Sequence, residues 1–277
     1  MKYALVALVL STGTAVAACP PVAEMEKAAN GWLNGERLPD PGLQSVEDGA
    51  CAYAAYLPAL EDALGKPVGV KVGFTSKPAQ EKFGVTAPAA GALFAPMILE
   101  NGKDVSLKGS RSPFYEADLI VTVGDAAIMQ AKTRADVVKA LKDVRPFVEL
   151  PDVALAEGVK PTGALMTAYG VMPWRGVVGD PVPISDLADP EADLATLSVD
   201  LKANGATVST GKGDMLLGHP LDVVLWLVNQ GGYDLPPGTM ISLGSLSQLN
   251  PAKPGETIEA DYTLGGKPMQ VSFKLVE

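Results

Sequence analysis

The spacing of hydrophobic positions changes along the chain, from a helical period near the N-terminus to alternation further on. In one stretch the apolar residues stand three or four apart, which predicts a one-sided helix over 22–33, with Val22, Met25, Ala29 and Trp32 on its buried face. Ser45-Val46-Glu47-Asp48 resembles a capping box, so a second helix should follow it. Pro58 is expected to kink or split that second helix.

After residue 67 the pattern is typical of short strands. Strands are predicted over 68–74, 118–123, 147–150, 197–203, 257–263 and 269–275, with the last three in an antiparallel sheet. One helix should be capped by Thr133 and Asp136 and run through Val144, and another should cover 213–230 and end at Gly231-Gly232. The region 180–196 is interpreted as a surface connection. This mixture predicts an α+β fold.

Composition narrows the class of protein. The 277 residues are 47% hydrophobic and 19% charged, which suits a folded core and excludes a mainly disordered chain. A formal net charge of −10 argues against general nucleic-acid binding. The sequence has no P-loop and no G-x-G-x-x-G unit, so nucleotide cofactors are not indicated.

The first eighteen residues resemble an export signal. Lys2 is followed by an apolar run from Tyr3 to Leu10 and by the A-x-A pattern Ala15-Val16-Ala17, where a signal peptidase would cut. No later segment is apolar over about twenty residues, so no transmembrane helix is expected. The pattern predicts an exported, periplasmic protein.

The two cysteines, Cys19 and Cys51, have three interpretations. In an oxidising compartment they would form a disulfide. Alternatively, Val16-Ala17-Ala18-Cys19 resembles a bacterial lipobox, which would anchor the chain through a lipid on Cys19 and leave Cys51 free. In the third, both remain free thiols. A metal site built on these two sulfurs is not expected, because no histidine or further cysteine completes a ligand set.

Three acidic residues stand where apolar side chains are expected. Glu116 and Asp118 lie two residues apart at the start of a strand, so their carboxylates share one face of a sheet. Glu149 interrupts a second apolar strand. Buried together, these groups would repel, and a hard cation such as Mg²⁺ or Mn²⁺ would relieve the cost. By spacing alone, a solvated strand edge beside a lysine or arginine is the more common arrangement, so both interpretations stand.

Two further residues are chemically informative. Lys71 lies in an apolar strand, either as an edge residue whose ammonium reaches water or as an active-site cation. His219, the only histidine, lies in Gly218-His219-Pro220, and no nucleophile-elbow motif is present. A Ser-His-Asp hydrolase is therefore excluded, and His219 is expected to be structural or to line a pocket.

Taken in order, several segments resemble the 2-keto-4-pentenoate hydratase family of the fumarylacetoacetate hydrolase superfamily, over residues 45 to 275. Glu116-Ala117-Asp118 looks like the family's E-x-E motif, and Glu149-Leu150-Pro151-Asp152 like its E-x-x-D. The other matching stretches are Lys71-Val72-Gly73-Phe74-Thr75-Ser76, Phe83-Gly84-Val85, Gly91-Ala92-Leu93-Phe94, Leu217-Gly218-His219-Pro220-Leu221, Trp226-Leu227, Pro237-Gly238 and Gly244-Ser245-Leu246.

The resemblance implies a fold and a division of the chain. The fold would be a fumarylacetoacetase-like β-roll of mixed sheets with peripheral helices. Residues 1–18 would be the signal peptide, 19–66 a small N-terminal helical lobe, and 67–277 the β-roll catalytic domain. Relatives are commonly oligomeric, so a homo-oligomer is expected on this ground alone.

The resemblance also implies a reaction on a small 2-oxo acid. Three carboxylates would hold Mg²⁺ or Mn²⁺: Glu116, Asp118 and Glu149. The metal would stabilise an enolate while a 2-hydroxy-2,4-dienoate isomerises and takes up water to give a 4-hydroxy-2-oxo acid. Lys71 would anchor the substrate carboxylate or carry a proton, and Asp152 would orient Lys71. Ser245 and the backbone near Gly244 would hold the substrate oxygens.

Three departures from the family pattern keep alternatives open. Asp118 replaces a glutamate, and Tyr169-Gly170-Val171-Met172 aligns where relatives have a polar D-N-A-S-like stretch. The export signal is unusual for enzymes of cytoplasmic aromatic degradation. The alternatives are a 2-oxo acid decarboxylase or C–C hydrolase of the same superfamily, and a non-catalytic periplasmic protein that binds keto acids.

Overall fold

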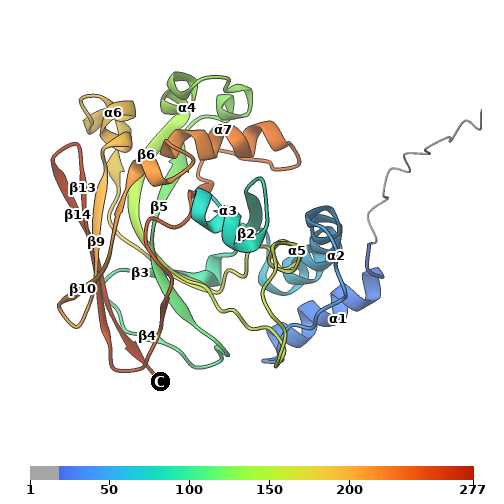
Figure 1. Ribbon diagram of the computed structural model, residues 1–277. Helices are drawn as coiled ribbons and strands as arrows, with labels where there is room; N and C mark the ends of the chain where they lie inside the picture. The colour runs from blue at the N-terminus through green and yellow to red at the C-terminus, as the bar shows by residue number, and fades with distance from the viewer. Residues whose placement is uncertain (1–18) are drawn as a thin grey trace, which may run out of the picture.

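The computed structural model describes residues 19–277 and consists of two curled sheets with helices around them (Figure 1). The predicted export signal falls on residues 1–18, outside the described residues. The α-helices are α1 (Val22–Leu33), α2 (Val46–Leu64), α3 (Lys77–Phe83), α4 (Arg134–Ala140), α5 (Gly163–Ala168), α6 (Pro190–Ala195) and α7 (Pro220–Gln230). Short 3₁₀ turns are η1 (Ala95–Met97), η2 (Ala126–Gln130), η3 (Ile184–Asp186) and η4 (Gly213–Met215). Among the described helices, none combines the length and the apolar character that a membrane span requires.

The larger sheet is mixed and carries the strands around which the site is built. Its main path, in spatial order, is β2 (Ala89–Leu93), β1 (Gly69–Gly73), β11 (Met240–Ser242), β5 (Phe114–Val123), β6 (Leu141–Leu150), β7 (Arg175–Val178) and β3 (Ile98–Glu100). Two short strands join it at the sides: β12 (Asn250–Pro251) on β5 and β8 (Val182–Pro183) on β6. The pair of β1 with β11 is parallel, whereas β11, β5, β6 and β7 are antiparallel neighbours.

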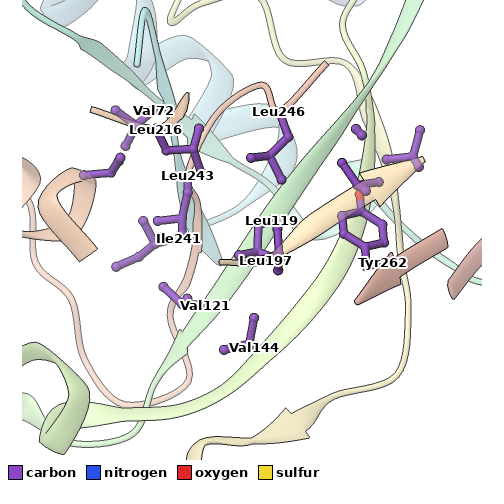
Figure 2. Close-up of a cluster of buried hydrophobic side chains, with 14 of the residues drawn as sticks. Val72, Leu119, Val121, Val144, Leu197, Leu216, Ile241, Leu243, Leu246 and Tyr262 are labelled. Atoms are coloured by element: carbon purple, nitrogen blue, oxygen red, sulfur yellow. The ribbon is translucent and has the colours of Figure 1, made fainter. Parts of the chain in front are cut away.

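The smaller sheet closes the main core from the other side. Its order is β10 (Ala206–Lys212), β9 (Ser198–Ala203), β13 (Thr257–Leu264), β14 (Lys267–Val276) and β4 (Val105–Ser106). Because side chains alternate along a strand, Leu119 and Val121 of β5 enter this core, while Glu116 and Asp118 belong to the opposite face. Figure 2 shows Leu119 and Val121 in the core with Tyr262 of β13. The hydroxyl of Tyr262 lies within hydrogen-bond distance of the carbonyl oxygens of Asp118 (2.8 Å) and Phe147 (2.6 Å), which ties the two sheets together.

The N-terminal helices form a second apolar cluster together with α5 and β2. A disulfide between Cys19 and Cys51, whose Cα atoms are 5.4 Å apart, fastens the start of the described chain to α2. The predicted capping box is confirmed, because Ser45 and Asp48 exchange side-chain to backbone hydrogen bonds at the start of α2. Pro58 does not split this helix, which continues from Val46 to Leu64.

Two predicted boundaries are wrong, each for a local reason. The helix expected through Val144 ends at Ala140, because Pro146 disfavours helical backbone at Arg145 and the segment pairs with β5 instead. The helix expected from residue 213 begins only at Pro220, since Leu217 and Gly218 both have positive φ angles (53° and 86°). The region 180–196 lies mostly at the surface, as predicted, and contains the short elements β8, η3 and α6. The α+β prediction and the other predicted strands are confirmed.

Candidate active site

A cavity of about 280 Å³ opens beside β1 and β5. Its wall is formed by the end of β1 with the loop that follows, by α3, and by the loop after β11. The residues that line the cavity include Lys71, Phe74, Lys82, Phe83, Glu116, Val153, Met166, Val171, Gly244, Ser245 and Leu249. Of the residues that the sequence singled out, Lys71, Glu116, Gly244 and Ser245 line this cavity.

Lys71 is a buried cation and not an edge residue. It lies in β1 between β2 and β11, with Gly91 and Ser242 as its Cα partners, and is only 4% exposed. Its Nζ donates a hydrogen bond to the carbonyl oxygen of Val171 (3.1 Å) and forms an ion pair with Oε1 of Glu149. Burial lowers the pKa of Lys71, but the neighbouring charges of Glu149 and Glu116 outweigh it and leave this pKa raised.

Glu116 and Glu149 face each other across two strands. They are direct Cα partners in the β5–β6 ladder, so their side chains share one face of the sheet. Glu149 is 1% exposed, and apart from the Lys71 ion pair no hydrogen-bond donor reaches either of its carboxylate oxygens. Burial raises the pKa of Glu149 well above its usual value; Lys71 opposes this rise, and Glu116 and Asp118 add to it. This carboxylate is left without the donors that a buried acid normally has.

Asp118 lies on the same face, but both oxygens of its carboxylate already accept hydrogen bonds from other groups of the protein. It is fully buried; Oδ2 accepts a hydrogen bond from Ser242 Oγ (2.5 Å), and Oδ1 accepts from the backbone N–H groups of Gly244 (2.9 Å) and Leu119 (2.5 Å). Burial raises the pKa of Asp118 to about 7, against the lowering effect of these hydrogen bonds. Asp118 therefore anchors the loop after β11 to β5.

The carboxylates of Glu116, Asp118 and Glu149 are suited to a hard divalent cation, but their present arrangement fits one only in part. Over residues 19–277, no group of three or more His, Cys, Asp or Glu side chains is arranged as it stands so that it could hold a metal ion. Two features nevertheless fit: the buried oxygens of Glu149 have no donor besides the Lys71 ammonium, and Glu116 lies opposite on the same face. The Lys71 ammonium supplies a positive charge beside Glu149. Carboxylate oxygens without nitrogen or sulfur partners favour Mg²⁺ or Mn²⁺ over Zn²⁺.

The partner of Lys71, the carbonyl of Val171, was not identified from the sequence. Gly170, Val171 and Met172 follow one another with φ angles of 60°, 61° and 53°, a left-handed turn that is unusual for a β-branched residue. The turn packs against β2 so closely that a Cβ on Gly91 would lie 2.0 Å from the Gly170 carbonyl oxygen. Gly91 is thus required for this approach, and the segment that departs from the family pattern contributes a backbone acceptor in place of polar side chains.

The loop 244–247 is held both by β5 and by its own contacts. The amide of Gly244 donates to Asp118, and Ser245 Oγ donates to the carbonyl oxygen of Ser247 (2.5 Å). Both residues line the cavity, as the resemblance implies, but the Gly244 amide and the Ser245 hydroxyl proton are already used within the protein.

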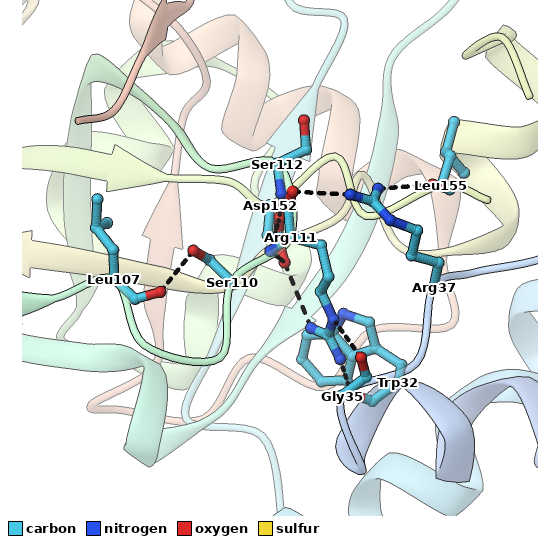
Figure 3. Close-up of polar contacts among 9 residues, drawn as sticks. All are labelled: Trp32, Gly35, Arg37, Leu107, Ser110, Arg111, Ser112, Asp152 and Leu155. Atoms are coloured by element: carbon cyan, nitrogen blue, oxygen red, sulfur yellow. Dashed lines mark hydrogen bonds and ion pairs between the residues drawn. The ribbon is translucent and has the colours of Figure 1, made fainter. Parts of the chain in front are cut away.

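Asp152 does not have the position expected of a residue that orients Lys71. Its carboxylate accepts hydrogen bonds from the backbone amides of Ser112 (2.6 Å) and Arg111 (3.1 Å) and pairs with the Arg111 guanidinium (3.4 Å; Figure 3). Asp152 does not belong to the cavity wall. It clamps the 111–112 loop, and the expected orienting role is a wrong prediction because Asp152, paired with Pro113 three positions after Glu149, belongs to the opposite face of the ladder.

His219 is structural, as one of the two sequence interpretations had it. It is the N-cap of α7, where its Nδ1 accepts a hydrogen bond from the amide of Leu221 (3.1 Å). The other ring nitrogen, Nε2, therefore carries the proton and donates to the carbonyl oxygen of Glu191 (3.0 Å). His219 does not line the cavity beside Lys71.

Hydratases of dienoate and keto-pentenoate substrates are among the known proteins with a similar sequence. The chain is 32% identical to a 2-hydroxyhexa-2,4-dienoate hydratase of Comamonas testosteroni over 225 residues, which cover 78% of this chain and 81% of the relative. It is also 32% identical to a 2-keto-4-pentenoate hydratase of Paraburkholderia xenovorans, over 71% of this chain and 73% of the relative. No family model matches the chain.

The fold is also that of a solved enzyme structure. A 4-oxalocrotonate decarboxylase from Pseudomonas putida G7, complexed with magnesium and adipate, superimposes with a TM-score of 0.78 and 27% identity. The match covers 92% of this chain and 97% of the other. This similarity confirms the mixed α+β fold with curled sheets that the sequence resemblance implied.

Proposed function

Since the chain belongs to the 2-keto-4-pentenoate hydratase family, we propose that it is a divalent-metal-dependent hydratase. It would add water to a 2-hydroxy-2,4-dienoate and yield a 4-hydroxy-2-oxo acid. The observation that carries the proposal is the buried carboxylate of Glu149, which lies opposite Glu116 and has no donor other than the ammonium of Lys71, a residue of the cavity wall. A metal held by Glu116, Glu149 and Asp118 would act as a Lewis acid toward the 2-oxo group.

The chain's own residues have defined tasks in this reaction. An ammonium group has three N–H donors, and Lys71 uses two of them on Val171 and Glu149. The third remains for the substrate carboxylate, so Lys71 binds and orients the substrate. Asp118 holds the loop of Gly244 against β5 and so keeps that side of the cavity in place. Phe74, Met166 and Val171 shield the reacting atoms from bulk water.

A decarboxylase is the second candidate, because the solved structure given above is that of a 4-oxalocrotonate decarboxylase. Its bound ligand, adipate, is a dicarboxylate, and a second substrate carboxylate calls for a second cation in the cavity. Besides Lys71, only one cationic side chain lines the cavity, the exposed Lys82, while Phe83, Val153, Met166 and Leu249 are apolar. This lining favours a substrate with an uncharged tail, and hence the hydratase.

The test uses the ultraviolet absorbance of 2-hydroxypenta-2,4-dienoate with Mg²⁺ or Mn²⁺. We expect metal-dependent loss of absorbance by the wild-type protein and a fall of about 100-fold or more for Glu149→Gln, as for loss of an electrostatic catalytic group. Asp143→Asn is the matched control, since Asp143 is also a buried acid of β6 but bonds Thr122 and Arg145 outside the cavity. Release of CO₂ from 4-oxalocrotonate would support the decarboxylase instead. Metal-dependent binding without turnover would support a keto-acid-binding protein, and no metal dependence at all would contradict the proposal.

We also propose that the protein is exported to the periplasm. Lys2, the apolar run after it and the Ala15-x-Ala17 pattern support this, and a Cys19–Cys51 disulfide is the kind of bond that persists in an oxidising compartment. Mass spectrometry of the protein from the periplasmic fraction tests it. The expected mass is that of a chain cut near residue 18 and lacking two hydrogens, whereas a large apolar increment would indicate lipid on Cys19.

A further inference from the structure

A second cleft lies between the N-terminal helices and the edge of the larger sheet. It has a volume of about 440 Å³ and shares no lining residue with the cavity beside Lys71. Two tryptophans and three cationic side chains line it: Trp32, Trp174, Lys108, Arg111 and Arg175. We call these five residues, with Leu64 and Met97, the cationic cleft.

The charge of the cationic cleft is opposite to that of the molecule. The chain has a net charge of −10, yet no aspartate or glutamate lines this cleft. Arg111 is neutralised by Asp152 and also donates to backbone carbonyls of Trp32 and Gly35 (Figure 3). Lys108 and Arg175 have no carboxylate within ion-pair distance anywhere in the described chain. Two uncompensated positive charges therefore face the same cleft.

Arg175 is the residue best placed to receive an anion. Its guanidinium lies over the ring of Trp174, 4.4 Å from the ring centroid, and only Nη1 is used, in a hydrogen bond to the carbonyl oxygen of Ser106. A guanidinium has five N–H donors in a plane that matches a carboxylate. Burial without an acidic neighbour lowers the pKa of Arg175. The group is thus partly desolvated, fixed in orientation by the indole, and short of acceptors.

The remaining surface of the cleft suits a flat apolar body. Arg111 lies over the ring of Trp32 at 5.6 Å, so both indoles are positioned by cations. Met97 is buried and Leu64 partly buried beside them. The volume lies within the range of small-molecule sites, which combine apolar walls with a few polar anchors.

From these contacts we propose that the cationic cleft is a second binding site, distinct from the catalytic cavity, for a small aromatic carboxylate. The carboxylate pairs with Arg175, with Lys108 adding charge, and the ring packs against Trp174 and Trp32.

The experiment is isothermal titration calorimetry of the whole protein with benzoate, and with acetate as the carboxylate lacking a ring. We expect one benzoate per chain, at least about tenfold weaker binding in Arg175→Gln and in Trp174→Leu, and at least about tenfold weaker binding of acetate to the wild-type protein. Arg175→Lys, which keeps the charge but loses the planar donors, should also weaken benzoate. Circular dichroism melting and the dienoate assay show whether each variant is folded.

A variant of the catalytic cavity separates the two sites. Glu116→Gln should bind benzoate as the wild type does, whether or not the chain proves to be a hydratase. Benzoate binding that is unchanged in folded Arg175→Gln, or that is lost in Glu116→Gln, would overturn the proposal. Equal binding of acetate and benzoate would overturn the aromatic part of it.

Discussion

At Gly91 a missing side chain has a direct consequence for the active site. A Cβ there would lie 2.0 Å from the carbonyl oxygen of Gly170, next to the turn whose Val171 carbonyl holds Lys71. Gly91→Ala should therefore displace the turn, reduce dienoate hydration strongly and lower the free energy of unfolding by about 1–3 kcal/mol. Activity assays and urea denaturation measure both effects.

The matched control for that prediction is Gly31→Ala in α1. The nearest atom to a new Cβ there belongs to the flexible Glu36 side chain, which can move, and alanine is a better helix former than glycine. This variant should keep its activity and its stability. Wild-type activity in Gly91→Ala would show that the close approach to Gly170 does not matter.

The site residues that could be predicted from the sequence are those that interrupt a run of apolar residues. Lys71 and Glu149 stand out because each interrupts an apolar strand, and the structure pairs them. The Val171 carbonyl gave no such signal, since every residue has a carbonyl and only the turn geometry makes this one an acceptor. Asp152 was assigned a catalytic task by motif alone, but its bonds go to Arg111 and Ser112.

Among the elements, α2 is joined to the segment before α1 by the Cys19–Cys51 disulfide, which spans 32 positions of the sequence. Closing a loop of this length restricts the unfolded chain, so the Cys19→Ser, Cys51→Ser double variant should lose about 2–4 kcal/mol of unfolding free energy. Chemical denaturation measures the loss. Dithiothreitol should reproduce it in the wild-type protein and have no effect on the double variant. Equal stability of all forms would contradict the prediction.

A cross-strand ion pair in the smaller sheet should make its stability depend on pH. Lys202 donates to Asp261 (2.6 Å), as does Gln270 (2.7 Å), and these bonds, with Lys202 first, hold the pKa of Asp261 below its usual value. The ion pair therefore stabilises the fold at pH values above the ordinary aspartate pKa. This stabilisation is lost as the pH falls through the lower pKa that Asp261 has in the folded protein. Because Asp261 is 38% exposed, solvent screening limits the contribution to below about 1 kcal/mol.

The measurement compares Asp261→Asn with the wild-type protein in urea. The variant should be less stable at pH 7, and the difference should shrink at about pH 3. Asp200→Asn is the control, because Asp200 lies directly opposite Asp261 and the two like charges repel. That substitution should not destabilise the sheet. A difference for Asp261→Asn that grows toward acid pH would refute the assignment.

Helices and strands could be predicted where the sequence pattern that specifies them is local. The capping box at Ser45 and the alternation in β13 and β14 gave the right elements. Residues 141–144 were predicted as the end of a helix, yet they form the first part of β6, because their pairing with β5 is a long-range contact without a local sequence signal. The same ladder sets Glu116 opposite Glu149, so the register of two strands determines the site and could not be read from either strand alone.

Over the whole molecule, the site depends on three long-range connections. The β1–β11 pair places Lys71 beside Ser242, the β5–β6 pair joins the two glutamates, and the turn after α5 supplies the Val171 carbonyl. The folded chain thus gathers three acids around one ammonium group, which is the only donor that reaches Glu149 among the described residues. Such an arrangement stores repulsion that a bound cation would relieve.

Magnesium should accordingly stabilise the entire fold and not only support turnover. A ligand that binds only the native state at a hundredfold excess over its dissociation constant adds about 2.7 kcal/mol, or about 5–10 °C in Tm for a chain of this size. Differential scanning calorimetry should show this shift in the wild-type protein and in Asp143→Asn, with reversal by EDTA. Glu149→Gln should show little shift, because the carboxylate that lacks donors is replaced by a neutral amide. An equal shift in Glu149→Gln would mean that magnesium binds elsewhere, and the metal site on β5 and β6 would have to be abandoned.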